Sequence, residues 1–209
     1  VGISSVSTDV DALLTRVRLH PKMEGADLVA HVTCQAPYVV PARGPRRATV
    51  AAIDLGIKAN TPRELAERGV EVHVLPASST ADDVFAIDPD GVFFSNGPGD
   101  PATADHAVEL AVAALTADLP VFGICFGHQV IGRALGLPTY SHRGINQPVL
   151  DRRSNRIDIT SHNHGFAIDA PINRRTPTKF GTVEVSHVCL NDDVVEGLEL
   201  SRDGRVVAF

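Results

Sequence analysis

Short apolar runs alternate with longer amphipathic segments from Thr49 to about residue 136. The predicted strands are residues 49–53, 70–75, 91–95 and 120–124, and helices predicted after the last two are 103–117 and 126–136. Strands that alternate with helices in this way are typical of a parallel sheet with helical crossover connections. We therefore predict an α/β fold built around a parallel sheet.

The pattern changes after Tyr140. Shorter runs separated by turn residues predict further strands at 156–160, 181–187 and 194–200. Because strands joined by short turns pair antiparallel, we expect a mixed, mainly parallel sheet with an antiparallel extension. Ligands of an open parallel sheet lie beyond the carboxyl ends of its strands. The candidate loops at these ends are residues 54–60, residues 95–101 and the turn at Cys125.

Residues 1–48 differ from the rest of the chain. Residues 9–17 have the pattern of a short amphipathic helix, and several prolines and Gly44 interrupt the stretch that follows. We interpret residues 1–48 as a connector and residues 49–209 as the folded domain. Within the domain, Thr61-Pro62-Arg63-Glu64 has the order of a capping box with proline at the first helical position. This order predicts a helix that begins after Thr61.

Composition narrows the class of protein. The chain has 209 residues, 44% of them hydrophobic, which is enough for one substantial core. A net charge of -6 argues against a surface for nucleic acid or for an anionic membrane. No apolar run approaches the roughly 18–20 residues of a membrane span. The 3 cysteines are too scattered for a disulfide framework. Together these features predict a cytoplasmic protein.

The segment Gly123-Ile124-Cys125-Phe126-Gly127 joins a predicted strand to a predicted helix. Its two glycines leave room for a sharp turn at the cysteine, as in the nucleophile elbow of hydrolases. Unpaired N–H groups at the start of a helix favour the thiolate, which is the reactive form of cysteine. The pattern therefore indicates a nucleophile at Cys125, although a buried structural cysteine at a strand end fits these residues about equally well.

The loop at residues 95–101 has the sequence Ser-Asn-Gly-Pro-Gly-Asp-Pro and follows a predicted strand. It is expected to lie beside Cys125, and its glycines allow backbone N–H groups to be directed at an anion. Together with the N–H group of Phe126, the loop would form an oxyanion hole for acyl transfer. Taken alone, the same residues also match an ordinary tight turn.

Three histidines, His142, His162 and His164, lie close together in the sequence. Such a group suggests zinc, but no cysteine joins the histidines in the spacing of a known zinc motif, so we predict no metal site. The segment Ser-His-Asn-His-Gly-Phe at 161–166 is better interpreted as a turn that faces a substrate.

Five segments occur in an order that resembles one family. They are Asp-Leu-Gly-Ile-Lys-Ala-Asn at 54–60, Ser-Asn-Gly-Pro-Gly-Asp-Pro at 95–101, Gly-Ile-Cys-Phe-Gly-His-Gln at 123–129, His-Arg-Gly-Ile-Asn-Gln-Pro-Val at 142–149 and His-Asn-His-Gly-Phe-Ala at 162–167. The chain resembles the small, glutamine-hydrolysing subunits of carbamoyl-phosphate synthases, which are class I glutamine amidotransferases. The resemblance covers essentially all of the chain and implies the three-layer fold of that class. These residues include no counterpart of the family's amino-terminal domain.

The resemblance implies roles for the matched residues. Cys125 would attack the carboxamide of glutamine, release ammonia and form a glutamyl thioester that water hydrolyses. The N–H groups of Gly99 and Phe126 would face the oxyanion. The residues implied to contact glutamine are Gly97, Gly99, Phe126, Gln129, Asn163, Gly165 and Phe166.

The resemblance also implies a partner. A large synthetase subunit would combine the ammonia with bicarbonate and ATP to make carbamoyl phosphate for arginine and pyrimidine biosynthesis. ATP and Mg would bind to that partner. No cofactor is implied for this chain.

The sequence departs from the family in two places. The family strand that matches 206–209 continues Ser-x-Gln-x-His-Pro-Glu, which supplies the catalytic histidine and glutamate, and this sequence ends before them. The family also has several more residues between Tyr140 and His142. We expect missing segments at both places and at the amino terminus. His128 should point away from Cys125, and neither His164 nor His187 is expected to replace the base, so residues 1–209 alone should be nearly inactive.

Three other interpretations stay open. The chain would also fit a class I amidotransferase that serves a different synthase. A cysteine peptidase or a deglycase-like enzyme of the same broad fold would use a similar elbow on another acyl substrate. A non-catalytic scaffold would dock a synthetase without hydrolysing glutamine.

Overall fold

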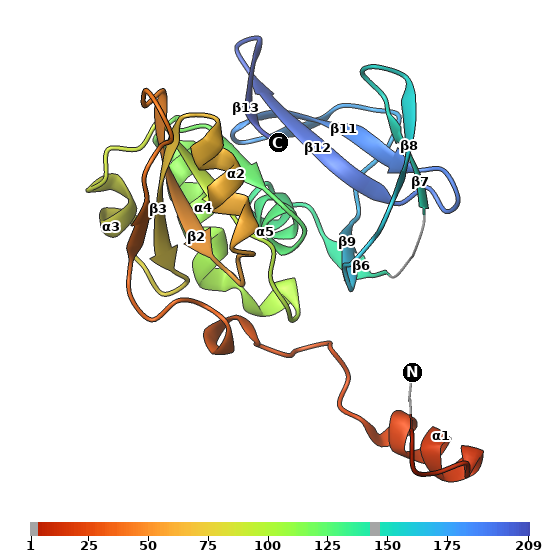
Figure 1. Ribbon diagram of the computed structural model, residues 1–209. Helices are drawn as coiled ribbons and strands as arrows, with labels where there is room; N and C mark the ends of the chain where they lie inside the picture. Colours follow the sequence, from red (N-terminus) through yellow and green to blue (C-terminus); the bar gives the residue numbers. More distant parts are fainter. Residues whose placement is uncertain (1–3, 143–146) are drawn as a thin grey trace.

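The computed structural model describes residues 4–142 and 147–209 (Figure 1). The strands are β1 Tyr38–Val40, β2 Ala48–Asp54, β3 Val70–Pro76, β4 Gly91–Phe94, β5 Val121–Gly123, β6 Thr139–Ser141, β7 Gln147–Asp151, β8 Arg156–Thr160, β9 Phe166–Ile168, β10 Thr176–Thr178, β11 Gly181–Cys189, β12 Val195–Arg202 and β13 Arg205–Ala208. The helices are α1 Val10–Leu19, α2 Asn60–Glu67, α3 Ala81–Phe85, α4 Asp105–Thr116 and α5 Phe126–Ala134, with short 3-10 turns at Val29–His31 and Pro101–Thr103.

The described strands form one mixed sheet with the order β1-β3-β2-β4-β5-β13-β12-β11-β7-β8. Strands β3, β2, β4, β5 and β13 pair in parallel. Beyond β13 the pairing is antiparallel through β12, β11, β7 and β8. The mixed α/β sheet is confirmed. The expectation that it is mainly parallel is wrong, because the strands after Tyr140 are joined by short turns, so more strand pairs are antiparallel than parallel.

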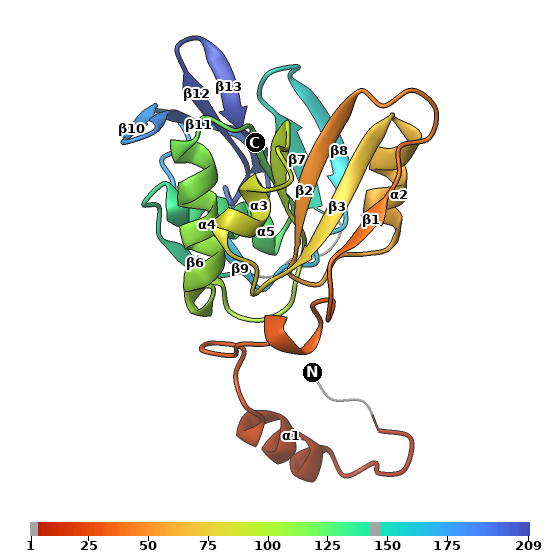
Figure 2. The same cartoon turned by 90° about the vertical axis from the view of Figure 1, so that its left-hand side faces the viewer.

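The parallel half has three layers. Helix α2 lies on one face of the sheet, and α3, α4 and α5 lie on the other (Figure 2). Alternate residues of β2 point to opposite faces, so Ala51 and Ile53 pack in the same cluster as residues of α4 and α5. Ala52 points the other way and packs with Val72 of β3 and with Leu65 of α2. The strand is therefore buried on both sides, as its continuous apolar run predicts.

Helix α2 does not begin as predicted. It starts at Asn60, one residue before Thr61, and no side chain caps its first turn. The backbone of Ala59 is already in the right-handed helical region, and the N–H of Thr61 donates to the carbonyl of Lys58 at 2.8 Å. Thr61 is thus inside the helix and the capping box assigned to it is wrong. Pro62 still lies in the first turn, where its missing N–H costs little.

The connector assigned to residues 1–48 contains the predicted amphipathic helix. Helix α1 is capped by the carboxylate of Asp9 and has no buried residue. Strand β1, in the same segment, pairs antiparallel with β3 at the edge of the sheet. The boundary between residues 48 and 49 stays a prediction. None of the helices in the described residues has the length and apolar character needed to cross a membrane.

Candidate active site

Cys125 occupies a strained turn between β5 and α5. Its backbone has φ 56 and ψ -110, a conformation that side-chain-bearing residues rarely adopt. A Cβ atom on Gly127 would lie 2.0 Å from the carbonyl oxygen of Phe94, and one on Gly123 would lie 2.6 Å from the backbone of Gly127. The elbow therefore requires both glycines, and the sharp turn predicted at Cys125 is confirmed.

The loops that follow β2 and β4 are joined to each other beside the elbow. The hydroxyl of Ser95 accepts a hydrogen bond from the N–H of Leu55 at 2.9 Å, and the side-chain amide of Asn96 donates to the carbonyl of Gly56 at 2.8 Å. A Cβ atom on Gly97 would lie 2.2 Å from the carbonyl oxygen of Leu55. Glycine at 97 therefore lets the two loops touch, and the backbone rather than a side chain faces the cysteine.

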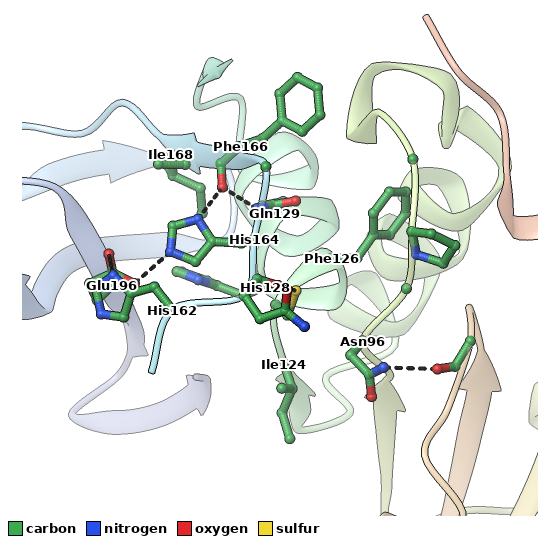
Figure 3. Close-up of a pocket in the computed structure, with 18 of the residues that line it drawn as sticks. Asn96, Ile124, Phe126, His128, Gln129, His162, His164, Phe166, Ile168 and Glu196 are labelled. Atoms are coloured by element: carbon green, nitrogen blue, oxygen red, sulfur yellow. Dashed lines mark hydrogen bonds and ion pairs between the residues drawn. The ribbon is translucent and has the colours of Figure 1, made fainter. Parts of the chain in front are cut away.

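A pocket of about 630 Å³ opens at the carboxyl ends of these strands (Figure 3). Parts of all three predicted loops line it. The predicted site residues among its lining are Gly97, Gly99, Cys125, Phe126, Gln129, Asn163, Gly165 and Phe166. The structure thus brings all of them together at one cavity, while their individual contacts with glutamine stay predictions. The motif at 142–149 lies partly outside the described residues.

The side chain of Cys125 is half-buried at the edge of the pocket. Burial is the main cause that raises the pKa of Cys125 above its ordinary value, and the negative charge of Glu196 adds to this. The N–H groups of Phe126 and Gly97 and the charge of Lys58 act in the opposite direction but do not outweigh burial. The N–H of Phe126 at the helix start therefore favours the thiolate, as expected, but desolvation of the sulfur is the stronger effect.

Backbone groups surround the sulfur of Cys125. The N–H groups that lower its pKa belong to Phe126 and Gly97, and the thiol donates to the carbonyl oxygen of Asn163 at 3.6 Å. Gly99 lines the pocket with φ +102, and a Cβ atom there would lie 2.6 Å from the carbonyl of Ala26. Phe126 and Gly97 are thus the N–H groups that approach the sulfur, and the oxyanion role of Gly99 stays a prediction.

Gln129 connects the elbow helix to the segment that closes the other side of the pocket. Its buried side-chain amide donates to the carbonyl oxygen of Phe166. We call residues 161–166 the histidine turn. Because Gln129 lies one helical turn beyond Cys125, this hydrogen bond ties the position of the histidine turn to that of the nucleophile.

Glu196 of β12 lines the pocket and was not predicted from the sequence. One carboxylate oxygen lies 3.2 Å from Nδ1 of His162, and the other lies 3.2 Å from Nε2 of His164. The pairing of Val195 with Ile168 places Glu196 behind the histidine turn. No local signal marks Glu196, because its partners are some thirty residues away in the sequence and only strand pairing brings them together.

His128 lies on the side of the pocket where Glu196 and His164 gather, as Figure 3 shows. Burial lowers the pKa of His128 to about 4, so the ring is neutral at physiological pH. Within residues 4–142 and 147–209, no histidine nitrogen hydrogen-bonds the thiol of Cys125. The expectation that His128 points away from the sulfur stays a prediction, since both residues line the same pocket.

Known proteins resemble this chain in sequence and in fold. Residues 51–209 match the family described as glutamine amidotransferase class-I. The chain therefore belongs to the class I glutamine amidotransferases. It is similar to curated proteins named carbamoyl phosphate synthase small chain. It is 59% identical to the one from Streptomyces coelicolor over 206 residues, which cover 96% of this chain and 54% of that protein.

A second relative of the same name, from Mycobacterium tuberculosis, is 54% identical over 200 residues, covering 92% of this chain and 53% of the relative. The chain thus spans about half the length of the curated relatives it matches. A solved structure from Thermoplasma acidophilum, described as a GMP synthase component, aligns with TM-score 0.61 and 18% identity, over 77% of this chain and 81% of that one. That likeness supports the fold alone.

Proposed function

We propose that this chain is the glutamine-hydrolysing part of a carbamoyl-phosphate synthase small subunit, with Cys125 as its nucleophile. One observation carries the proposal: the cysteine occupies the strained elbow at the floor of a pocket, with the N–H groups of Gly97 and Phe126 beside its sulfur. The identity to carbamoyl phosphate synthase small chains over more than nine-tenths of this chain supports the choice of partner enzyme.

The chemistry proceeds in two steps. The sulfur of Cys125 forms a bond to the carboxamide carbon of glutamine, and the resulting oxyanion is stabilised by backbone N–H groups at the elbow. Ammonia leaves with a proton, which yields a glutamyl thioester. Water then attacks the thioester carbon, glutamate leaves and the thiol is restored. In this proposal Gln129 reaches back to the substrate, and Asn163, Gly165 and Phe166 hold its amino-acid end.

The elbow requires a general base. Burial favours the thiol over the thiolate, and no imidazole in the described residues is bonded to the sulfur. Strand β13 runs parallel to β5, and the N–H of Gly123 donates to the carbonyl of Phe209 at 3.0 Å. The carboxyl end of β13 therefore lies beside the strand that leads to Cys125, and we propose that a base acts on the thiol at this side of the elbow.

The ammonia is consumed by a large synthetase subunit, which binds ATP and Mg and makes carbamoyl phosphate from bicarbonate. In this proposal the small and large subunits form a heterodimer in the cytoplasm and supply arginine and pyrimidine biosynthesis. The acidic net charge of -6 and the absence of a long basic block in the sequence agree with a protein partner rather than nucleic acid.

The test compares two nitrogen sources in the complete small chain bound to its large partner. Cys125→Ser should reduce glutamine-dependent carbamoyl phosphate synthesis to background while synthesis from free ammonia continues at the wild-type rate. The ammonia reaction serves as the control for folding and assembly. Glutamine-dependent synthesis that survives in Cys125→Ser would exclude Cys125 as the nucleophile, and a wild-type assembly that uses only ammonia would favour the scaffold interpretation.

A further inference from the structure

The histidine turn, the residue that follows β6 and strand β12 bring three ligand-bearing side chains to one point. One nitrogen each of His142 and His164 and one carboxylate oxygen of Glu196 lie within 4.8 Å of one another. The three side chains are largely enclosed, with exposed fractions of 11%, 10% and 14%. Figure 3 shows Glu196, His162 and His164 gathered on the side of the pocket opposite Asn96.

Outer hydrogen bonds orient two of these imidazoles. Nε2 of His142 lies 2.9 Å from a carboxylate oxygen of Asp192, which accepts its N–H. Nδ1 of His164 lies 2.9 Å from the carbonyl oxygen of Phe166, which likewise accepts an N–H. With these protons placed, Nδ1 of His142 and Nε2 of His164 carry lone pairs. An imidazole that donates its other N–H to a carboxylate or carbonyl is the usual arrangement of a metal-binding histidine.

The third imidazole follows the same rule. The hydroxyl of Thr160 donates to the carbonyl of Gln147 at 3.3 Å, so its oxygen is free to accept the N–H at Nε2 of His162, 2.9 Å away. Nδ1 of His162 is then a lone pair that lies 3.2 Å from Glu196. The exposed fraction of the His162 side chain is only 5%.

Several buried atoms at this site have no hydrogen-bond partner of good geometry. These atoms are Nδ1 of His142, Nδ1 of His162, Nε2 of His164 and one carboxylate oxygen of Glu196. Buried polar atoms in folded proteins are nearly always paired, and a group of unpaired acceptors at one place is best explained by a cation between them.

We propose that His142, His164 and Glu196 bind a divalent transition-metal ion such as Zn²⁺, while His162 lies against the other oxygen of Glu196. Two imidazoles with one carboxylate form a donor set that suits Zn²⁺, and a hard cation such as Mg²⁺ would take mostly oxygen ligands. This donor set revises the sequence-based expectation of no metal, which considered the three histidines without Glu196. The metal site does not depend on the proposed glutaminase activity.

Zn²⁺ binding to the complete chain is measured by calorimetry and by competition with a chromogenic chelator. Wild type should bind one Zn²⁺ per chain at this site. Glu196→Gln and His142→Asn keep the shape of the side chain but remove a ligand, and each should weaken binding by at least about 100-fold. Asp192→Asn removes only the outer partner of His142 and should weaken binding by about 10- to 100-fold.

Two further variants serve as controls. His73 of β3 is paired with Glu71 at 3.0 Å. Strands β2, β4, β5 and β13 separate β3 from β12, so His73→Asn should bind Zn²⁺ as wild type does. Cys125→Ser should also keep the site, because the thiol is not among the ligands. Circular dichroism verifies that each variant is folded.

Equal affinity in wild type, Glu196→Gln and His142→Asn would overturn the proposal and leave a hydrogen-bonded histidine network. A loss confined to Cys125→Ser would also overturn it, because the ion would then be held by the thiol. The site would be established, whether or not the chain hydrolyses glutamine, by a large loss of Zn²⁺ affinity in Glu196→Gln and His142→Asn and a smaller loss in Asp192→Asn. The affinity of His73→Asn should be unchanged.

Discussion

The elbow at Cys125 and the histidine turn face each other across one pocket, and different forces hold them. The backbone fixes the elbow: Gly123 and Gly127 permit contacts of β5 and α5 that no side chain would allow. Side chains fix the histidine turn, through Gln129 from α5 and Glu196 from β12. Both depend on distant contacts, but the elbow is marked in the sequence by its two glycines, whereas nothing local marks the partners of the histidine turn.

The largest expected effect comes from adding one methyl group to the elbow. In Gly127→Ala the new Cβ atom would meet the carbonyl oxygen of Phe94 at 2.0 Å, so β4 and α5 must move apart. We expect the free energy of unfolding to fall by more than about 3 kcal/mol. Urea unfolding followed by circular dichroism measures this change.

Gly136→Ala is the matched control at the other end of the same helix region. Gly136 has φ +82 but open space around its Cβ position, so the variant should lose only about 1–2 kcal/mol from backbone strain. If Gly136→Ala cost as much as Gly127→Ala, close packing would not be what distinguishes the elbow.

The free energy of unfolding should fall in acid because of the buried His128 beside the histidine turn. The folded pKa of His128 is lowered to about 4 by burial, below its ordinary value of 6.5, so protons bind more tightly to the unfolded chain. The contribution of His128 is complete above about pH 6.5 and is lost as the pH falls toward 4. From pH 7 to pH 4 this amounts to about 3 kcal/mol.

His128→Gln isolates this contribution, because His164, whose pKa Glu196 raises, acts in the opposite direction in both proteins. The free energy of unfolding of wild type relative to His128→Gln should fall by about 3 kcal/mol between pH 7 and pH 4. Parallel stability curves for the two proteins would show that the His128 ring is hydrated rather than buried.

The smallest effect concerns strain stored at the nucleophile. The φ of 56 and ψ of -110 at Cys125 cost about 1–3 kcal/mol for a residue with a side chain. Cys125→Gly relieves this strain, although glycine adds about 0.5–1 kcal/mol of chain entropy to the unfolded state. We expect a net gain of about 1 kcal/mol in urea unfolding together with loss of glutamine hydrolysis. A variant less stable than wild type would show that the elbow is relaxed.

Much of the parallel half was predictable from the sequence, for a physical reason. The runs at 49–53 and 91–95 are almost entirely apolar because β2 and β4 are buried on both faces. The run at 70–75 alternates apolar residues with Glu71 and His73, and the observed β3 confirms it as a strand. The elbow was predictable because a sharp turn at a cysteine requires glycine at nearby positions. The order of the motifs then indicated the class of enzyme.

The antiparallel half was harder to predict. Strands β6, β9 and β10 have three residues each, and such short runs carry almost no periodic signal. The helix start at Asn60 was misplaced because a backbone turn, rather than the side chain of Thr61, begins α2. Glu196 escaped notice because a lone glutamate in a strand is ordinary until the pairing of β9 with β12 places two imidazoles against it.

The central claim is that Cys125 is the nucleophile that meets glutamine, and covalent labelling tests it most directly. The other cysteines are natural controls: burial next to Asp54 raises the pKa of Cys34 to about 11, and burial also raises the pKa of Cys189. The complete protein is treated with an electrophilic glutamine analogue and analysed by peptide mass spectrometry.

We expect a single adduct on the peptide that contains Cys125. Added glutamine should slow its formation, and Cys125→Ser should not form it. Labelling of Cys34 or Cys189 at the same rate, or labelling of Cys125 that glutamine does not slow, would contradict the central claim.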